Sequence, residues 1–221
     1  MIYIIITTLV LPLVVALLLF IFQKDKNTEN TPNHFNKNYN STTDKENIAD
    51  LFLYNLINNN GYLLTNVLLP LSNEESTEID AIIISNKGIF CIEVKNRIGR
   101  ISGDNYDKYW IQHYYDPSKE DKKHRNPYIQ NQNHCYALAE FLNNAYSIIN
   151  IVLFVELNEF SEIYSSSTFS LDDFAHYYDS LPSDIITNDD IDYVYDTLKV
   201  FEATKIELEN HRNFLKNKYR D

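Results

Sequence analysis

Residues 78–95 read Glu-Ile-Asp-Ala-Ile-Ile-Ile-Ser-Asn-Lys-Gly-Ile-Phe-Cys-Ile-Glu-Val-Lys. Two runs of mostly β-branched and aliphatic residues flank Ser-Asn-Lys-Gly, which is the composition of a tight turn, so the segment predicts a β-hairpin. Both runs are apolar at nearly every position instead of alternating with polar residues. This pattern indicates central strands that are covered on both faces of a sheet.

Charged residues stand at the open end of this predicted hairpin. Side chains alternate across a strand, so Glu78 and Asp80 share a face, as do Glu93 and Lys95. A loop of two or four residues places Asp80 opposite Glu93 and Glu78 opposite Lys95. A three-residue loop with a bulge at Gly88 would place the two pairs on opposite faces. We expect the even-numbered loop.

In that register the Asp80 and Glu93 side chains lie about 5 Å apart at Cβ. Two unit charges about 4 Å apart repel by about 4 kcal/mol at an effective dielectric near 20. A Mg²⁺ ion would offset this repulsion, because proteins hold it with one or two carboxylates, waters and substrate phosphate. The alternative is an ion pair between Glu78 and Lys95 at a solvated strand end, and the spacing alone leaves both interpretations open.

The spacing and the surrounding motifs resemble a known family. Asp80, twelve residues and then Glu93-Val94-Lys95 resemble the PD-(D/E)xK nuclease core. The wider resemblance is to the nuclease-related domain (NERD) family over about residues 44–157, and it is carried in order by GYLLTNVLLP (61–70), EIDAIIISNKGIFCIEVKN (78–96), GRISG (99–103), Trp110 and NPYIQNQNH (126–134). It implies an α/β fold, namely a restriction-endonuclease-like α/β sandwich with a mixed central sheet.

The resemblance also implies an activity. It predicts a Mg²⁺- or Mn²⁺-dependent nuclease that hydrolyses phosphodiester bonds of DNA or RNA, with DNA the expected partner and no small-molecule cofactor. Asp80 and Glu93 would hold the metal, with the backbone carbonyl of Val94 as a third ligand. Lys95 would position the attacking water or stabilise the transition state, and Gln130 would orient it. The alternative is a catalytically silent domain that serves as a membrane-anchored module binding nucleic acid or protein.

Two further polar positions have more than one interpretation. Glu46 ends Thr43-Asp44-Lys45-Glu46, which has the form of a capping box, but the resemblance makes it an accessory metal ligand. His134 lies with Gln130 on the continuation of a buried helical stripe that follows the helix start at Asn126-Pro127. We assign Gln130 to the site and expect His134 to bond to backbone in the core or to face solvent.

The charge of the chain is unevenly distributed. The net charge is -12, which argues against a protein that coats nucleic acid along its whole surface. Residues 87–125, however, hold nine Lys or Arg against six Asp or Glu. This segment supplies candidate phosphate contacts, unless it is a chance cluster in a solvated loop. The candidates are Arg97, Arg100, Lys122, Lys123 and Arg125.

The N-terminal residues predict a membrane anchor. Residues 2–22 are uncharged and apolar, and as a helix at about 1.5 Å per residue they span about 31 Å, the thickness of a bilayer core. The basic start and small-residue exit of a signal peptide are missing. Lys24 and Lys26 follow the span, which places the rest of the chain in the cytoplasm, at the cell membrane. Cys91 and Cys135 are expected to be unpaired core thiols.

The domain organisation follows from these features. We expect an anchor over residues 1–22, a polar linker over 23–43, the nuclease-like domain over 44–158 and a helical extension over 159–221. The expected strands are 62–69, the two arms of the hairpin, 99–102, 109–115 and 148–157, and residues 116–125 are expected to be a charged loop.

Overall fold

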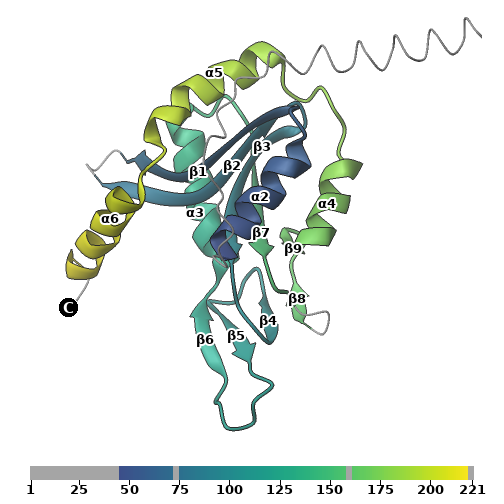
Figure 1. The fold of residues 1–221 in the computed structure, drawn as a ribbon, viewed down its shortest axis with the longest axis vertical. Coiled ribbons are helices and arrows are strands. Elements are labelled where there is room, and N and C mark those ends of the chain that lie inside the picture. The colour runs from purple at the N-terminus through teal and green to yellow at the C-terminus, as the bar shows by residue number, and fades with distance from the viewer. Residues whose placement is uncertain (1–44, 72–74, 158–160, 219–221) are drawn as a thin grey trace, which may run out of the picture. The chain divides into compact units, whose positions relative to one another are not determined.

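The computed structural model describes residues 45–71, 75–157 and 161–218, with side chains from Ile48 onward (Figure 1). The predicted anchor and linker, residues 1–43, lie outside the described residues. Within the described segments, no helix combines the length and the apolar character needed to cross a membrane. The protein is a mixed α/β structure with two sheets.

The main sheet is mixed, as predicted. Its antiparallel part pairs β1 with β2 and β2 with β3, and its parallel part pairs β3 with β7 and β7 with β9. In spatial order its five strands are β1 (Gly61–Pro70), β2 (Ser76–Ser85), β3 (Gly88–Lys95), β7 (Ile148–Phe154) and β9 (Thr168–Ser170).

Helices cover both faces of the main sheet, which explains why β2 and β3 are apolar at successive positions. On one face, α3 (Pro127–Phe141) and α5 (Asn188–Leu198) pack against a core that includes Ile82, Ile84 and Cys91. On the other, α2 (Lys45–Ile57) and α4 (Leu171–Ser180) lie across the strands (Figure 1). Cys91 and Cys135 are buried free thiols, as expected.

A second sheet was not predicted. Residues 99–102 and 109–115, expected as strands, contribute to a separate four-stranded sheet, and residues 122–125, expected within a loop, form one of its edge strands. The sheet consists of β6 (Lys122–Arg125), β5 (Tyr109–His113), β4 (Arg100–Asp104) and β8 (Glu162–Tyr164), in that order. We call it the small sheet.

Trp110 explains why the small sheet forms where it does. Its ring is fully buried, stacks on Phe154 of β7 with the ring centroids 6.4 Å apart, and donates from Nε1 to the carbonyl of Asp104. Gly103 leaves the space for this ring, because a Cβ there would lie 2.3 Å from a Trp110 ring atom and its φ is +151°. Trp110 thus packs the small sheet onto the end of the main sheet.

Helix α3 begins as predicted. Asn126 is its N-cap and accepts a hydrogen bond from the backbone N–H of Tyr128, and Pro127 is the first helical residue. The Asn126 amide also donates to the carbonyls of Asp104 and Asp107 in the β4–β5 turn. The start of α3 is therefore fixed to the small sheet.

The fully buried Asn131 fixes α3 on its other side. Its amide donates 2.8 Å bonds to the carbonyl of Cys91 on β3 and to Oδ1 of Asn150 on β7. A buried amide of this kind tolerates little displacement, because an unsatisfied group costs about 1–3 kcal/mol. Asn131 therefore sets the height of α3 above the sheet, and with it the positions of Gln130 and His134.

The C-terminal residues differ from the helical extension that the sequence predicts. Residues 162–170 contribute β8 to the small sheet and β9 to the main sheet before the chain continues as α4, α5, η1 (Lys199–Phe201) and α6 (Lys205–Lys218). In α6 Leu208 is buried, whereas Ile206 and Phe214 are exposed. Charged contacts with the start of β2 hold this helix, among them Arg212 with Glu78.

Candidate active site

The hairpin register places the two acids next to each other. The β2–β3 ladder runs from Ser85 opposite Gly88 to Ala81 opposite Ile92, so the loop has two residues and is even-numbered, as predicted. Continued by one residue, this register sets Asp80 opposite Glu93. Asp80 Oδ2 accepts a 2.8 Å hydrogen bond from the backbone N–H of Val94, so its carboxylate reaches across to β3.

Glu93 is the centre of the site. Its side chain is buried and is surrounded by three potential donors from β3 and α3. Lys95 Nζ and Gln130 Nε2 both donate to Oε1, the latter over 2.8 Å, and His134 Nε2 lies 3.5 Å from Oε2. Lys95 Nζ also donates to Gln130 Oε1 at 3.4 Å. The sequence-predicted residues Asp80, Glu93, Lys95 and Gln130 are thus brought together.

The two carboxylates have unequal proton affinities. Burial, followed by the negative charge of Glu93, raises the pKa of Asp80 to about 7, against a smaller lowering by the Val94 N–H and by Lys95. Burial also acts to raise the pKa of Glu93, but His134 and the charge of Lys95 outweigh it and hold that pKa below its usual value. Near neutral pH the pair therefore holds a full negative charge on Glu93 and a partial charge on Asp80.

His134 lies at the site, where we did not expect it. It is 9% exposed, its Nδ1 lies 2.8 Å from Thr77 Oγ1 on β2, and its Nε2 has no hydrogen-bond partner among the residues that the structure describes. Its spacing of four residues from Gln130 puts both on one face of α3, and this was the available sequence signal. Nothing in the sequence indicates the part taken by Thr77.

Two further metal ligands were predicted, the Val94 carbonyl and the Glu46 side chain. The Lys95 carbonyl accepts from the N–H of Val155, the residue after β7, so the neighbouring Val94 backbone groups point to the opposite edge of β3, toward Asp80. Glu46 lies in α2, but its side chain is outside the described atoms. Both assignments stay predictions.

The donor set fits a hard divalent ion held in part by water. The described residues contain no group of three or more His, Cys, Asp or Glu side chains arranged to hold a metal. Two adjacent carboxylates are nonetheless what Mg²⁺ commonly takes from a protein, with water and substrate phosphate as its remaining ligands. Burial and then the charge of Glu93 raise the pKa of Asp80, and a bound cation would offset both effects.

The alternative ion pair between Glu78 and Lys95 does not form. Glu78 instead accepts two hydrogen bonds from the guanidinium of Arg212 on α6, and Lys95 pairs with Glu93. The five predicted phosphate contacts are dispersed: Arg97 follows β3, Arg100 on β4 pairs with Glu162 at 3.0 Å, and Lys122, Lys123 and Arg125 lie on β6.

Comparison with known proteins agrees with this geometry. The sequence model of the nuclease-related domain, NERD, matches residues 41–155, just over half of the chain. The chain belongs to the nuclease-related domain family. The family resemblance of the motifs around Asp80, Glu93 and Lys95 is thereby confirmed.

Two individual proteins are similar to this NERD protein. An uncharacterized protein of Bacillus anthracis is 25% identical over 166 residues, which cover 72% of this chain and 76% of that protein. The small subunit of the heterodimeric restriction endonuclease R.BspD6I is 10% identical in sequence, with 80% of this chain and 99% of that chain covered and a TM-score of 0.26. A TM-score this low does not establish a shared fold.

Proposed function

We propose that this NERD protein is a membrane-tethered nuclease that hydrolyses phosphodiester bonds of DNA or RNA with the help of Mg²⁺ or Mn²⁺. The observation that carries the proposal is the adjacent Asp80–Glu93 pair. Burial, followed by the negative charge of Glu93, raises the pKa of Asp80 to about 7. Tethering at the cell membrane, with the nuclease-like domain in the cytoplasm, is supported by the sequence of residues 2–22 and the lysines after it.

In this proposal Asp80 and Glu93 hold the ion, with the Val94 carbonyl as a third ligand and Glu46 as an accessory one. When bound, the ion lowers the pKa of a coordinated water and neutralises charge on the scissile phosphate. Lys95 keeps its ammonium beside Glu93 and Gln130, where it stabilises negative charge developing on a phosphate oxygen. Gln130 donates to Glu93 and fixes the orientation of that carboxylate.

The experiment is a cleavage assay with the purified full-length chain on DNA and RNA, with Mg²⁺ or Mn²⁺. We expect Asp80→Asn to lower the rate by about 10²-fold or more, since a metal ion contributes several kcal/mol of charge stabilisation. Asp172→Asn, which changes an exposed aspartate in the first turn of α4, is the matched control. Unchanged cleavage by Asp80→Asn would reject the assignment.

A second candidate function is that of a catalytically silent binding domain. It is supported by the contacts that Asp80 and Glu93 already make with neighbouring groups. Glu93 pairs with Lys95 and Asp80 binds the Val94 N–H, as they would in a silent domain that binds nucleic acid or protein. Metal titration separates the two proposals. A nuclease should gain thermal stability from millimolar Mn²⁺ through Asp80, whereas a silent domain should melt at the same temperature with and without the ion.

A further inference from the structure

The strand alternation of the small sheet sorts its basic residues onto two faces. In the β5–β6 ladder, Lys122 lies opposite Gln112 and His124 opposite Trp110. Residues directly opposite each other in an antiparallel pair share a face, and neighbours along a strand alternate. Lys122 and His124 therefore share the face of Trp110, and Lys123 and Arg125 lie on the reverse face.

The Trp110 face is the one that adjoins the candidate active site. Trp110 stacks on Phe154, and Phe154 lies opposite Lys95 in the parallel β3–β7 ladder. Figure 1 shows the small sheet at the end of the main sheet where β3 runs into it. Trp110 itself is buried there, so a chain that leaves Lys95 in this direction meets this face at its exposed edge, strand β6.

Hydrogen bonds hold the segment after Lys95 against this face. Gln112 is buried; its Nε2 donates to the carbonyl of Ile98 over 2.7 Å, and its Oε1 accepts a 2.8 Å bond from His124 Nε2. Ile98 is the neighbour of Arg97, so this chain of bonds ties the backbone that carries Arg97 to β5 and β6.

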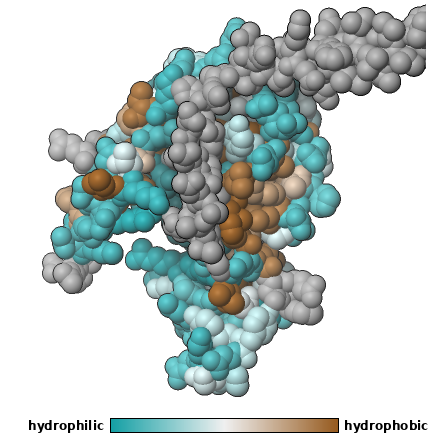
Figure 2. Space-filling model, viewed as in Figure 1, coloured by the Kyte–Doolittle hydropathy of each residue, from teal (hydrophilic) through white to brown (hydrophobic). Residues whose placement is uncertain are grey.

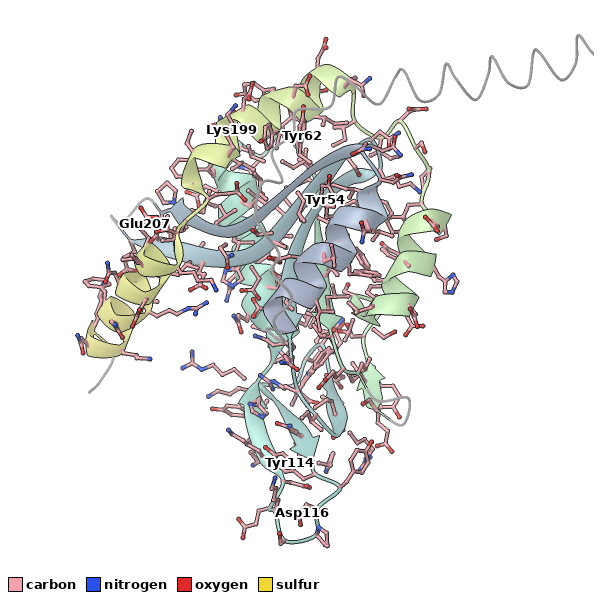
Figure 3. All side chains as sticks on the ribbon, in the orientation of Figure 1. Tyr54, Tyr62, Tyr114, Asp116, Lys199 and Glu207 are labelled. Atoms are coloured by element: carbon pink, nitrogen blue, oxygen red, sulfur yellow. The ribbon has the colours of Figure 1, made fainter. Side chains whose placement is uncertain are left out.

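Three cations act on His124, namely Arg97, Lys122 and Lys95. Burial, followed by the positive charges of Arg97, Lys122 and Lys95, lowers the pKa of His124 to about 4. Arg97 also interacts with the charge of Glu93 and with Tyr114, which follows β5 on the small sheet (Figure 3). His124 is thus neutral near pH 7, and the three positive charges that act on it come from the active site, the segment after β3 and β6.

Two of these three cations, Arg97 and Lys122, are available to an anion, whereas Lys95 pairs with Glu93. Within residues 45–71, 75–157 and 161–218, neither Arg97 nor Lys122 has an ion-pair partner, whereas Arg100 is paired with Glu162. Arg100 lies opposite His113, which places it on the reverse face with Lys123 and Arg125. The part of the small sheet in view in Figure 2 is hydrophilic to intermediate in hydropathy.

We propose that Lys95, Arg97 and Lys122 form a track for the phosphates of a polynucleotide that extends beyond the scissile bond along the exposed β6 edge of the Trp110 face of the small sheet. The track rests on the proposed function, because it begins at the proposed catalytic lysine. It selects polynucleotides over mononucleotides, since Arg97 and Lys122 meet only a chain that continues past the cleavage point. Arg100, Lys123 and Arg125 take no part in it.

The test is the salt dependence of binding, measured with the full-length chain and a fluorescent single-stranded DNA oligonucleotide in EDTA, where no cleavage takes place. Each phosphate contact contributes about 0.7 to the slope of log Kd against log salt for a single strand. We expect Arg97→Gln and Lys122→Gln each to reduce that slope by about this amount. Lys123→Gln and Arg125→Gln, from the same strand but the other face, should leave it unchanged.

Three outcomes overturn the track. These are an equal loss of slope in Lys123→Gln or Arg125→Gln, no loss in Lys122→Gln, and binding of a mononucleotide as tight as that of the oligonucleotide. Lys122 is exposed, so Lys122→Gln should fold and keeps the test valid if Arg97→Gln does not. Because binding is measured without a divalent ion, an inactive protein with a normal Lys122 effect would reject the nuclease and keep the track, and the reverse result would reject the track alone.

Discussion

The two ends of the β2–β3 hairpin carry similar residues and use them differently. At the turn, Lys87 Nζ donates to the carbonyls of Tyr178, Asp179 and Leu181 at the C-terminal end of α4. At the open end, Lys95 Nζ donates to a carboxylate and an amide that face a second carboxylate. The first lysine satisfies carbonyls that helix geometry leaves unpaired, and the second offsets part of an excess of negative charge. The role of each lysine is therefore set by its hydrogen-bond partners, which are helix carbonyls for Lys87 and a charged carboxylate for Lys95.

The largest expected effect comes from replacing Lys95 by methionine, compared with the same replacement at Lys87. Lys95→Met should lower kcat by about 10²–10³-fold, as loss of one preorganised charge donor does. Lys87→Met should leave kcat unchanged and lower the free energy of unfolding by about 1–3 kcal/mol. Cleavage is measured below both melting temperatures, and stability by denaturant unfolding. A loss of kcat in Lys87→Met would remove the distinction between the two ends.

The pH dependence of stability provides the next comparison. Because the pKa of folded Asp80 is raised from 3.8 to about 7, the folded state binds a proton more tightly than the unfolded state does. The free energy of unfolding should therefore fall as the pH rises from about 4 to about 7. This loss should be smaller in Asp80→Asn, and Mn²⁺ should raise the Tm more at pH 8 than at pH 5.5. A gain from Mn²⁺ that is independent of pH would contradict the assignment.

A smaller effect is expected from changing Thr77 or His134, which contact each other at the open end of the hairpin. Thr77→Val removes the hydroxyl from His134 Nδ1, and His134→Gln replaces the ring that faces Glu93. Each should weaken Mn²⁺ binding by about tenfold, as loss of an orienting partner does at metal sites. Calorimetric titration measures this, with Thr197→Val in α5 as the control because its hydroxyl donates to a helix carbonyl far from the site. Equal effects in Thr77→Val and Thr197→Val would leave His134 a packing residue.

The smallest expected effect lies at the turn. Tyr178→Phe removes a buried hydrogen bond from its hydroxyl to Ser85 Oγ and should cost about 1 kcal/mol of stability. Mn²⁺ affinity should not change, because the turn lies at the other end of the strands. Thermal unfolding and the same titration check both statements, and a shift in affinity would show that the two ends are coupled.

The parts of the fold and site that follow from local sequence were predicted. The two-residue loop fixes the hairpin register, so the juxtaposition of Asp80 and Glu93 could be deduced before the structure was known. Asn126 and Pro127 likewise fix the start of α3. These features depend on residues close together in the chain, where alternation and capping are reliable guides.

The parts that depend on distant residues were not predicted. Thr77 meets His134 across 57 residues, and Glu78 meets Arg212 across 134. The bidentate guanidinium of Arg212 is the partner of Glu78 in place of Lys95, which the alternative interpretation had paired with it, since its two parallel donors match a carboxylate. Lys122–Arg125 lacks any apolar alternation, and it forms a strand because β5 offers an edge to pair with.

The short strands β8 and β9 have a practical consequence. The family match stops at residue 155, yet β8 hydrogen-bonds to β4 and β9 to β7, so each sheet ends in a strand from beyond that limit. A fragment that ends at residue 155 would leave main-chain donors and acceptors of β4 and β7 unpaired. Exposed edge strands of this kind favour pairing with other chains. Recombinant fragments that stop there should aggregate, whereas the chain that continues through β8, β9 and the helices α4 to α6 should remain in solution.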